Sequence, residues 1–168
     1  MLRNTSGDRD AGRVRVTVNA VDASNAVIKT DSTTIEVIPA GTTYYHGGWM
    51  FPDPATNPVR LETFVQVGES RPKSASMPPV SNVALGATFF GDAEVRGEVS
   101  NPSTRPLSGL ARITVVVFDK GGNVLGGSFT YPSSAVPPGG RIGFSASVDG
   151  VSLPQVASAQ VSVEPDFD

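Results

Sequence analysis

The stretch GEVSNPSTRPLSGLARITVVVFDKGGNVLGG, residues 97–127, decides how the rest of the chain is interpreted. A short strand runs into an Asn-Pro turn at Asn101, and a β-branched run follows at residues 113–118. Asp119 and two glycines close that run as a hairpin turn, because glycine readily adopts the positive φ of tight turns. Residues 136–144, VPPGGRIGF, supply a further Pro-Gly turn. This succession of short strands and turns predicts an antiparallel β-sandwich.

The chain also repeats itself at an offset of 97 residues, which takes Asn4 to Asn101 and Asp22 to Asp119. Other matched pairs are Ser6 with Ser103, Arg15 with Arg112, Val18 with Val115, Val27 with Val124 and, after one residue of slip, Gly41 with Gly139. A repeat of this length is a whole domain, because solenoid units span only about 20–50 residues. The sequence therefore predicts two homologous domains in tandem.

We expect the first domain to span residues 1–70 and the second to span residues 81–168. Residues 71–80 form the predicted linker, which is polar and contains three prolines. Proline stiffens such a connection because its ring fixes φ.

The two predicted domains differ in how they begin. In the second, predicted strands at residues 82–90 and 93–100 precede the turn at Asn101, whereas the corresponding turn of the first begins at Asn4. The first domain is therefore expected to lack its opening strands. Truncation, folding back of the linker and donation of a strand by another chain each explain the gap. Because an open sheet edge pairs readily with a further strand, we predict a protein partner or self-association there.

Several of these segments resemble the FxLYD domain, an immunoglobulin-like sandwich of bacterial and archaeal surface and secreted proteins. The residues that carry the resemblance are Asn101-Pro-Ser, the run 115–119, Gly122, Pro138-Gly139-Gly140 and Phe144. The chain has Val115, Val117 and Phe118 where the family has Phe, Leu and Tyr. The resemblance implies an all-β protein of two tandem immunoglobulin-like antiparallel β-sandwich domains, secreted or exposed at the cell surface. The family shares no catalytic residues.

Composition narrows the expected partners. The net charge is −3 and the isoelectric point about 5.1, which argues against nucleic acid as a partner, because phosphate binding needs clustered Lys and Arg. The chain contains no cysteine, which excludes disulfides, thiolate nucleophiles and zinc–thiolate sites. We find no apolar run of about 18 residues and expect no membrane span. The first residues have no apolar signal region, so we expect the signal segment of an exported protein to be absent from this chain.

An aromatic stretch at residues 42–58 holds the only Trp and the only His of the chain. Tyr44, Tyr45, His46 and Trp49 are the candidate ligand-binding residues, as a platform for a sugar or a peptide with His46 as a polar contact. The competing interpretation, which we favour, is a strand whose Tyr44 and His46 share one face, followed by a core Trp49.

No catalytic, cofactor or metal site is predicted. A Ser-His-Asp triad needs a base, and His46, the only candidate, lies near no G-x-S-x-G motif. The sequence contains no phosphate-binding G-x-x-x-x-G-K-S/T loop and no acidic residue in an apolar setting. We therefore expect a non-catalytic module that serves as a structural spacer or a protein-interaction or assembly unit. The alternative is a carbohydrate- or peptide-binding accessory module that uses the aromatic stretch.

Overall fold

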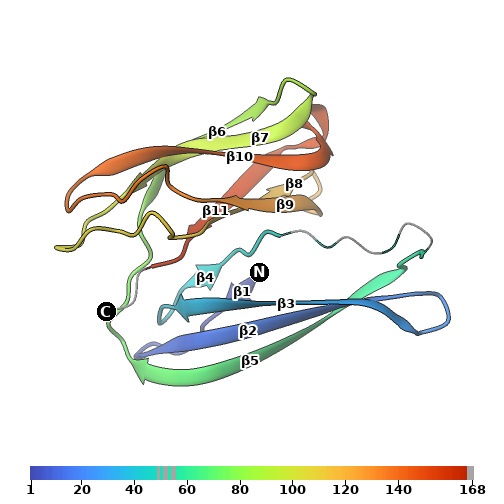
Figure 1. The fold of residues 1–168 in the computed structure, drawn as a ribbon, viewed down its shortest axis with the longest axis horizontal. Coiled ribbons are helices and arrows are strands. Elements are labelled where there is room, and N and C mark those ends of the chain that lie inside the picture. The colour runs from blue at the N-terminus through green and yellow to red at the C-terminus, as the bar shows by residue number, and fades with distance from the viewer. Residues whose placement is uncertain (49, 51–52, 54–55, 166–168) are drawn as a thin grey trace. The chain divides into compact units, whose positions relative to one another are not determined.

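The computed structural model describes residues 1–48, 50, 53 and 56–165 (Figure 1). The regular elements of these residues are antiparallel strands and one 3₁₀ turn, η1 Leu153–Gln155, so the all-β prediction is confirmed. The strands are β1 Leu2–Arg3, β2 Arg9–Val21, β3 Val27–Ile38, β4 Thr43–Tyr44, β5 Arg60–Pro72, β6 Val80–Ala87, β7 Asp92–Ser100, β8 Ile113–Phe118, β9 Val124–Thr130, β10 Arg141–Ser152 and β11 Ser158–Val163.

The chain divides into two compact units whose boundaries differ from the expected ones. The larger unit consists of Met1–Arg3, Thr43–Gly48 and Ser76–Asp168, and the smaller unit of Asn4–Thr42 and Trp49–Ala75. Strand β5 continues to Pro72, inside the stretch expected to be a linker. A short segment expected in the first domain, Thr43–Gly48, thus folds with the residues of the second.

The larger unit contains two three-stranded antiparallel sheets, in the orders β10-β7-β6 and β11-β8-β9, and the short antiparallel pair β1-β4. Both three-stranded sheets contribute to one apolar core, as in a β-sandwich. Strand β8 supplies Ile113, Val115 and Val117, which point to the same side because side chains alternate along a strand. Val95 on β7 and Val148 on β10 come from the opposing sheet, and all five side chains are buried.

The outer face of the β11-β8-β9 sheet is covered by Thr43–Gly48, which we call the strap. Thr114 donates a hydrogen bond from its hydroxyl to the carbonyl of Tyr45 at 2.5 Å. The backbone N–H of Tyr45 donates to the hydroxyl of Ser162 at 2.9 Å. Gly47 lies against the backbone of β8 and β9, where a Cβ atom would come within 2.6 Å of the amide nitrogen of Ser128. The strap explains why Thr114 is buried although it points away from the core.

The smaller unit contains one three-stranded antiparallel sheet, in the order β3-β2-β5. The repeat offset places β2, β3 and β5 on the segments that contain β8, β9 and β11, and the sheet orders agree. Val14 and Val16 of the central strand are buried and Arg15 between them is exposed, as the predicted alternation requires, whereas Val18 is half-buried. The second sheet of the larger unit has no counterpart among the described residues of the smaller one.

The matched Asp turns have the same hydrogen bonds in both units. Asp22 accepts bonds at Oδ1 from the backbone N–H groups of Ser24 and Ala26, at 2.8 and 2.9 Å. Asp119 accepts the equivalent bonds from residues two and four positions later, Gly121 and Asn123, at 2.7 and 2.8 Å. The Ser24 hydroxyl donates to Asp22 at 2.7 Å, and the Asn123 side-chain amide donates to Asp119 at 2.9 Å. These side-chain bonds, followed by the backbone bonds, hold the pKa of each carboxyl below its ordinary value, which fits a role in turn formation.

The matched Asn turns agree as well. Asn101 donates from its side-chain amide to the carbonyls of Arg105 and Val136, at 2.7 and 2.8 Å. Asn4 donates in the same way to the carbonyls of Arg9 and Ile38, at 2.8 and 2.9 Å. In each unit the side-chain oxygen accepts the backbone N–H of the serine two residues later. The sequence offset therefore has a counterpart in the local hydrogen bonding.

Candidate functional site

The predicted aromatic residues contribute to the packing of the larger unit. Tyr44 is fully buried, and its hydroxyl lies 3.4 Å from Oε1 of Glu164. Its ring stacks on His46 with centroids 6.4 Å apart. The ring of Tyr45 meets Phe118 edge to face at 6.3 Å. Trp49 lies outside the described residues. Tyr44 is thus enclosed, while Tyr45 and His46 are half-buried.

The electrostatics of Tyr44 agree with a packing role. Burial, followed by the negative charge of Glu164, raises the pKa of this phenol well above its ordinary value. The group therefore stays protonated at neutral pH and can donate to the Glu164 carboxylate. Its single polar atom is already engaged within the unit, which leaves no free hydroxyl for a bound sugar.

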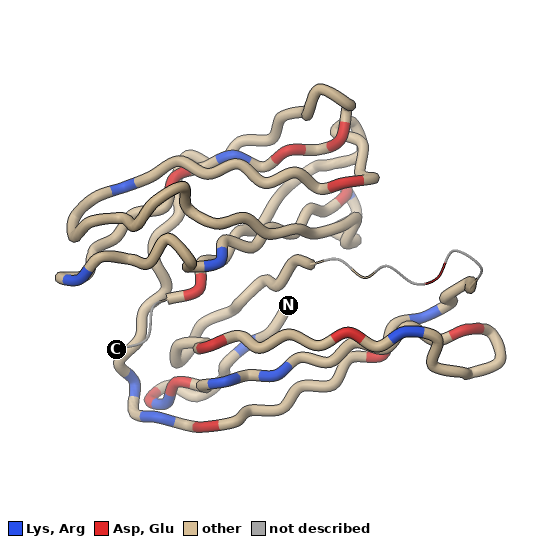
Figure 2. The backbone as a smooth tube through the Cα atoms, in the orientation of Figure 1, with Lys and Arg blue, Asp and Glu red and all other residues tan. Residues whose placement is uncertain are grey.

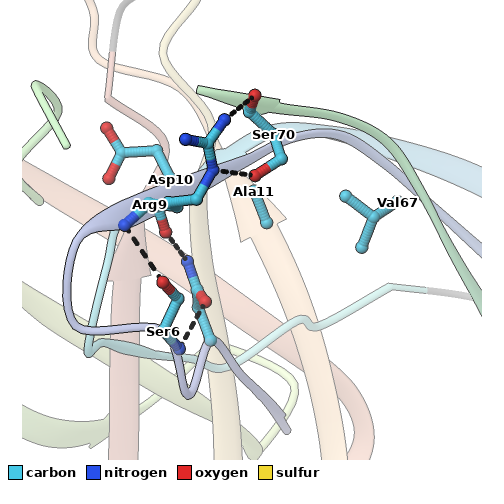
Figure 3. Close-up of a pocket in the computed structure, with 7 residues that line it drawn as sticks. Ser6, Arg9, Asp10, Ala11, Val67 and Ser70 are labelled. Atoms are coloured by element: carbon cyan, nitrogen blue, oxygen red, sulfur yellow. Dashed lines mark hydrogen bonds between the residues drawn. The ribbon is translucent and has the colours of Figure 1, made fainter. Parts of the chain in front are cut away.

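A polar pocket of about 240 Å³ lies in the smaller unit (Figure 3). Its lining residues are Asn4, Ser6, Arg9, Asp10, Ala11, Val67 and Ser70. Arg9 donates from its guanidinium to the hydroxyl and the carbonyl oxygen of Ser70, at 2.7 and 2.8 Å, and so joins β2 to β5. The backbone N–H of Arg9 donates to the hydroxyl of Ser6 at 3.0 Å. The polar groups of the pocket are therefore engaged in holding neighbouring segments together.

Asp10 is the one buried carboxylate of this pocket, and it serves the same purpose. It accepts backbone N–H bonds from Ala40, Ser74 and Ala75, each at 2.8 Å. Burial by itself would raise the pKa of Asp10, but these bonds and the charge of Lys73 outweigh it, and the pKa lies below its ordinary value. The carboxylate therefore joins the start of β2 to the turn after β3 and to the chain that follows β5.

The most exposed apolar surface of the smaller unit lies along β5. Among the described residues, this strand pairs with β2 on one side, and no strand pairs with its other side. Leu61, Phe64, Val65 and Val67 are each between 50% and 65% exposed. Pairing with Ala20, Val16 and Val14 of β2 places Leu61, Val65 and Val67 on the apolar face of the sheet, while Phe64 lies on the polar face beside Thr17. Strand β5 thus combines a free backbone edge with apolar side chains on both faces.

The charges of β5 are confined to its ends, as Figure 2 shows. Arg60 pairs with Glu62 at one end, and Arg71 pairs with Glu69 at the other, at 2.8 and 2.7 Å. Residues 63–68 between them carry no charge. The other edge of the sheet, β3, carries Lys29, Asp31 and Glu36 along its length, as blocked edges do.

A second exposed feature escaped the sequence analysis. Phe89 and Phe90 are 97% and 88% exposed at the turn between β6 and β7, where their rings meet edge to face at 5.4 Å. The sequence predicted a strand through residue 90, but β6 ends at Ala87, and Gly91 closes the turn with a φ of +89°. The Gly91-Asp92 pair was the signal that a hairpin turn, rather than a strand, holds these rings.

The described part of the chain contains neither a metal-binding cluster nor a helix that could span a membrane. Residues 1–48, 50, 53 and 56–165 contain no cluster of three or more His, Asp or Glu side chains placed to hold a metal ion. No helix in the same residues has the length and apolar composition to cross a bilayer. The distinctive surface features there are thus the β5 edge and the Phe89–Phe90 turn.

The fold and these features define an all-β protein built from antiparallel sheets, with exposed apolar groups on a strand edge and on a turn. No protein-family model and no curated protein matches the chain. Among solved structures, red sea bream transglutaminase aligns with 98% of this chain at 12% identity and a TM-score of 0.33. The chain spans 28% of the length of that protein, and a likeness this low assigns neither a fold family nor an activity.

Proposed function

We propose that this protein is a non-catalytic interaction module whose β5 edge binds an extended strand of a protein partner. The observation that carries the proposal is β5 itself, a strand of 13 residues with an uncharged, half-exposed apolar middle and one edge that no strand of the described residues pairs with. An added strand would gain main-chain hydrogen bonds along that edge and side-chain contacts on both faces.

A continuous register also distinguishes β5 from β6. Its register with β2 is continuous, whereas β6, an edge strand of the larger unit, has an irregularity between Ser81 and Ala84. Bulges of this kind protect an edge because they disturb the spacing that a new strand needs. Strand β5 lacks this protection along residues 63–68.

The matched turns and sheet orders favour two tandem immunoglobulin-like repeats, the smaller of which has one sheet, in place of two, among its described residues. The FxLYD resemblance favours a secreted or cell-surface parent protein, in which such a module acts as spacer and assembly unit. In this proposal the aromatic stretch is structural, because Tyr44 is enclosed and its hydroxyl is engaged.

A peptide library tests the proposal. Extended peptides with alternating apolar and polar residues are selected on the intact protein, and binders are mapped by amide chemical shifts in ¹⁵N-labelled protein. We expect binders to perturb β5 and to be lost in Val65→Lys. The matched control is Val27→Lys, because Val27 is 52% exposed on β3 and Val65 is 50% exposed on β5. Binding that maps to the Tyr44–His46 region, or that survives Val65→Lys, would refute the proposal.

A further inference from the structure

We infer that the strand received by β5 is the β5 strand of a second copy of this chain, antiparallel and related by a twofold axis at Phe64. This inference rests on the proposed strand addition and names its partner. The supporting observation is the order of residues along β5. Only some registers of this strand against the same strand of a second copy place apolar side chains opposite apolar side chains.

Backbone geometry restricts the possible registers. Successive residues of a strand direct their N–H and C=O groups to alternate sides, so every second residue of β5 is available to a new strand. When the strand pairs antiparallel with its own copy, even-numbered residues must therefore face even-numbered ones, and odd face odd. Within the uncharged residues 63–68, the twofold axis can pass through any residue. An axis at Thr63 opposes Glu62 to Phe64, and an axis at Val67 or Gly68 opposes Val65 to a charged residue, which leaves the axes at residues 64–66 to compare.

In the register centred on Phe64, the side chains that lie opposite each other are compatible on both faces of the sheet. It places Leu61 opposite Val67 of the second copy and Thr63 opposite Val65 of the second copy, so the apolar face continues across the junction. On the other face, Phe64 meets its own copy, and aromatic pairs across strands are stabilising. Glu62 then faces Gln66 of the second copy, and no like charges are opposed.

The other two registers oppose apolar and charged side chains. With the axis at Val65, Leu61 lies opposite Glu69 of the second copy. With the axis at Gln66, Leu61 lies opposite Arg71 and Thr63 lies opposite Glu69. Each of these arrangements removes water from a charge beside an apolar group, which is unfavourable. The charges at the ends of β5 thus select the Phe64 register.

The same geometry limits assembly to a dimer. Pairing through β5 forms one six-stranded sheet with β3 at each outer edge. The charges of β3 lie at Lys29, Asp31 and Glu36, spread along the strand, so the new edges resist further pairing. A twofold interface of this kind uses the same patch on both copies and therefore closes.

Two lysine substitutions on the same face of β5 test the register by analytical ultracentrifugation of the full chain. Phe64→Lys opposes two lysines at the axis and should raise the dimer dissociation constant at least about tenfold. Gln66→Lys places the new charge opposite Glu62 of the second copy and should lower the constant by about twofold to fivefold at low salt. Melting curves confirm that each variant is folded.

Single cysteines give an independent readout, because the chain has none of its own. In the Phe64 register, Phe64→Cys brings two sulfur atoms together across the axis and should form a disulfide-linked dimer under mild oxidation. Val65→Cys lies one residue from the axis, so its two copies are diagonal neighbours rather than opposed and should cross-link far less. Efficient linkage through Val65→Cys or Gln66→Cys instead would overturn the register.

The outcomes separate this inference from the proposed function. A protein that remains monomeric at millimolar concentration, yet binds selected peptides at β5, overturns self-pairing and leaves strand addition standing. A dimer that is indifferent to Phe64→Lys and is not linked through Phe64→Cys overturns the inference as well. A protein that neither dimerises nor binds a peptide at β5 overturns both.

Discussion

Replacing Asp10 should destabilise the smaller unit more than any other single change of a charged residue in that unit. The carboxylate is 3% exposed and accepts three backbone bonds, from Ala40, Ser74 and Ala75. In Asp10→Ala the buried N–H of Ala40 loses its partner, which costs about 1–3 kcal/mol. Ser74 is exposed and Ala75 half-buried, so their N–H groups recover much of the loss from water. The expected total is roughly 2–4 kcal/mol of unfolding free energy.

Asp10→Asn keeps one acceptor oxygen but turns an NH₂ group toward backbone donors, so a loss of about 1–3 kcal/mol is expected. Because the folded-state pKa of Asp10 lies below its ordinary value, its contribution is present in full well above the ordinary pKa of an Asp and is lost as the pH falls through the lower pKa of the folded state. The difference in stability between wild type and Asp10→Asn should therefore be largest near neutral pH and shrink below about pH 4.

Urea denaturation combined with native-state hydrogen exchange at Ala40, Ser74 and Ala75 measures the effect. Asp31→Asn is the charge-matched control, because Asp31 is exposed on β3 and its carboxylate accepts a bond from the adjacent N–H of Ser32. Two results would show that the carboxylate does not hold these segments together. One is equal stability of Asp10→Asn and Asp31→Asn, and the other is hydrogen exchange in Asp10→Asn that becomes faster elsewhere but not at the N–H of Ala40.

Two further predictions concern the larger unit and the matched turns. Gly47→Val should displace the strap from the sheet and lower the free energy of unfolding by about 1–3 kcal/mol. At Gly48 a Cβ atom would meet only the His46 ring, at 3.6 Å, so Gly48→Val should have the melting temperature of the wild type. Equal melting of the two would contradict the placement of the strap. Asn101→Ala should lower the free energy of unfolding by roughly 2–3 kcal/mol. Asn4→Ala should lower it by less, because Asn101 is buried and Asn4 is half-buried. The reverse order in thermal unfolding would contradict this reasoning.

The sequence by itself determined the all-β class and the local structure of the turns. Alternation of Val14, Val16 and Val18 identified a strand because side chains of a strand alternate between two faces whatever surrounds it. Asp22 and Asp119 identified turns because a short carboxylate bonds backbone groups within a few residues. Both signals are local and need no knowledge of distant contacts.

Only the tertiary structure decided which strand surfaces are covered. Val65 alternates with its neighbours as Val16 does, yet Val16 is buried and Val65 is half-exposed. The two residues face each other across β2 and β5, but β5 lies at the edge of its sheet. The sequence predicted an open edge in this half of the chain but did not name the strand, because alternation shows which face is apolar and not what packs on it.

Local sequence patterns also could not predict where the strap packs. Tyr44, Tyr45 and His46 have the composition of a ligand platform and of a packed strand alike. The sequence favoured the packed strand but did not show against which residues it packs. The distinction depends on Ser162 and Thr114, which are more than 60 residues away and hydrogen-bond to Tyr45. Contacts between segments so distant in the chain depend on the order of strands in space, which a local pattern of residues does not encode.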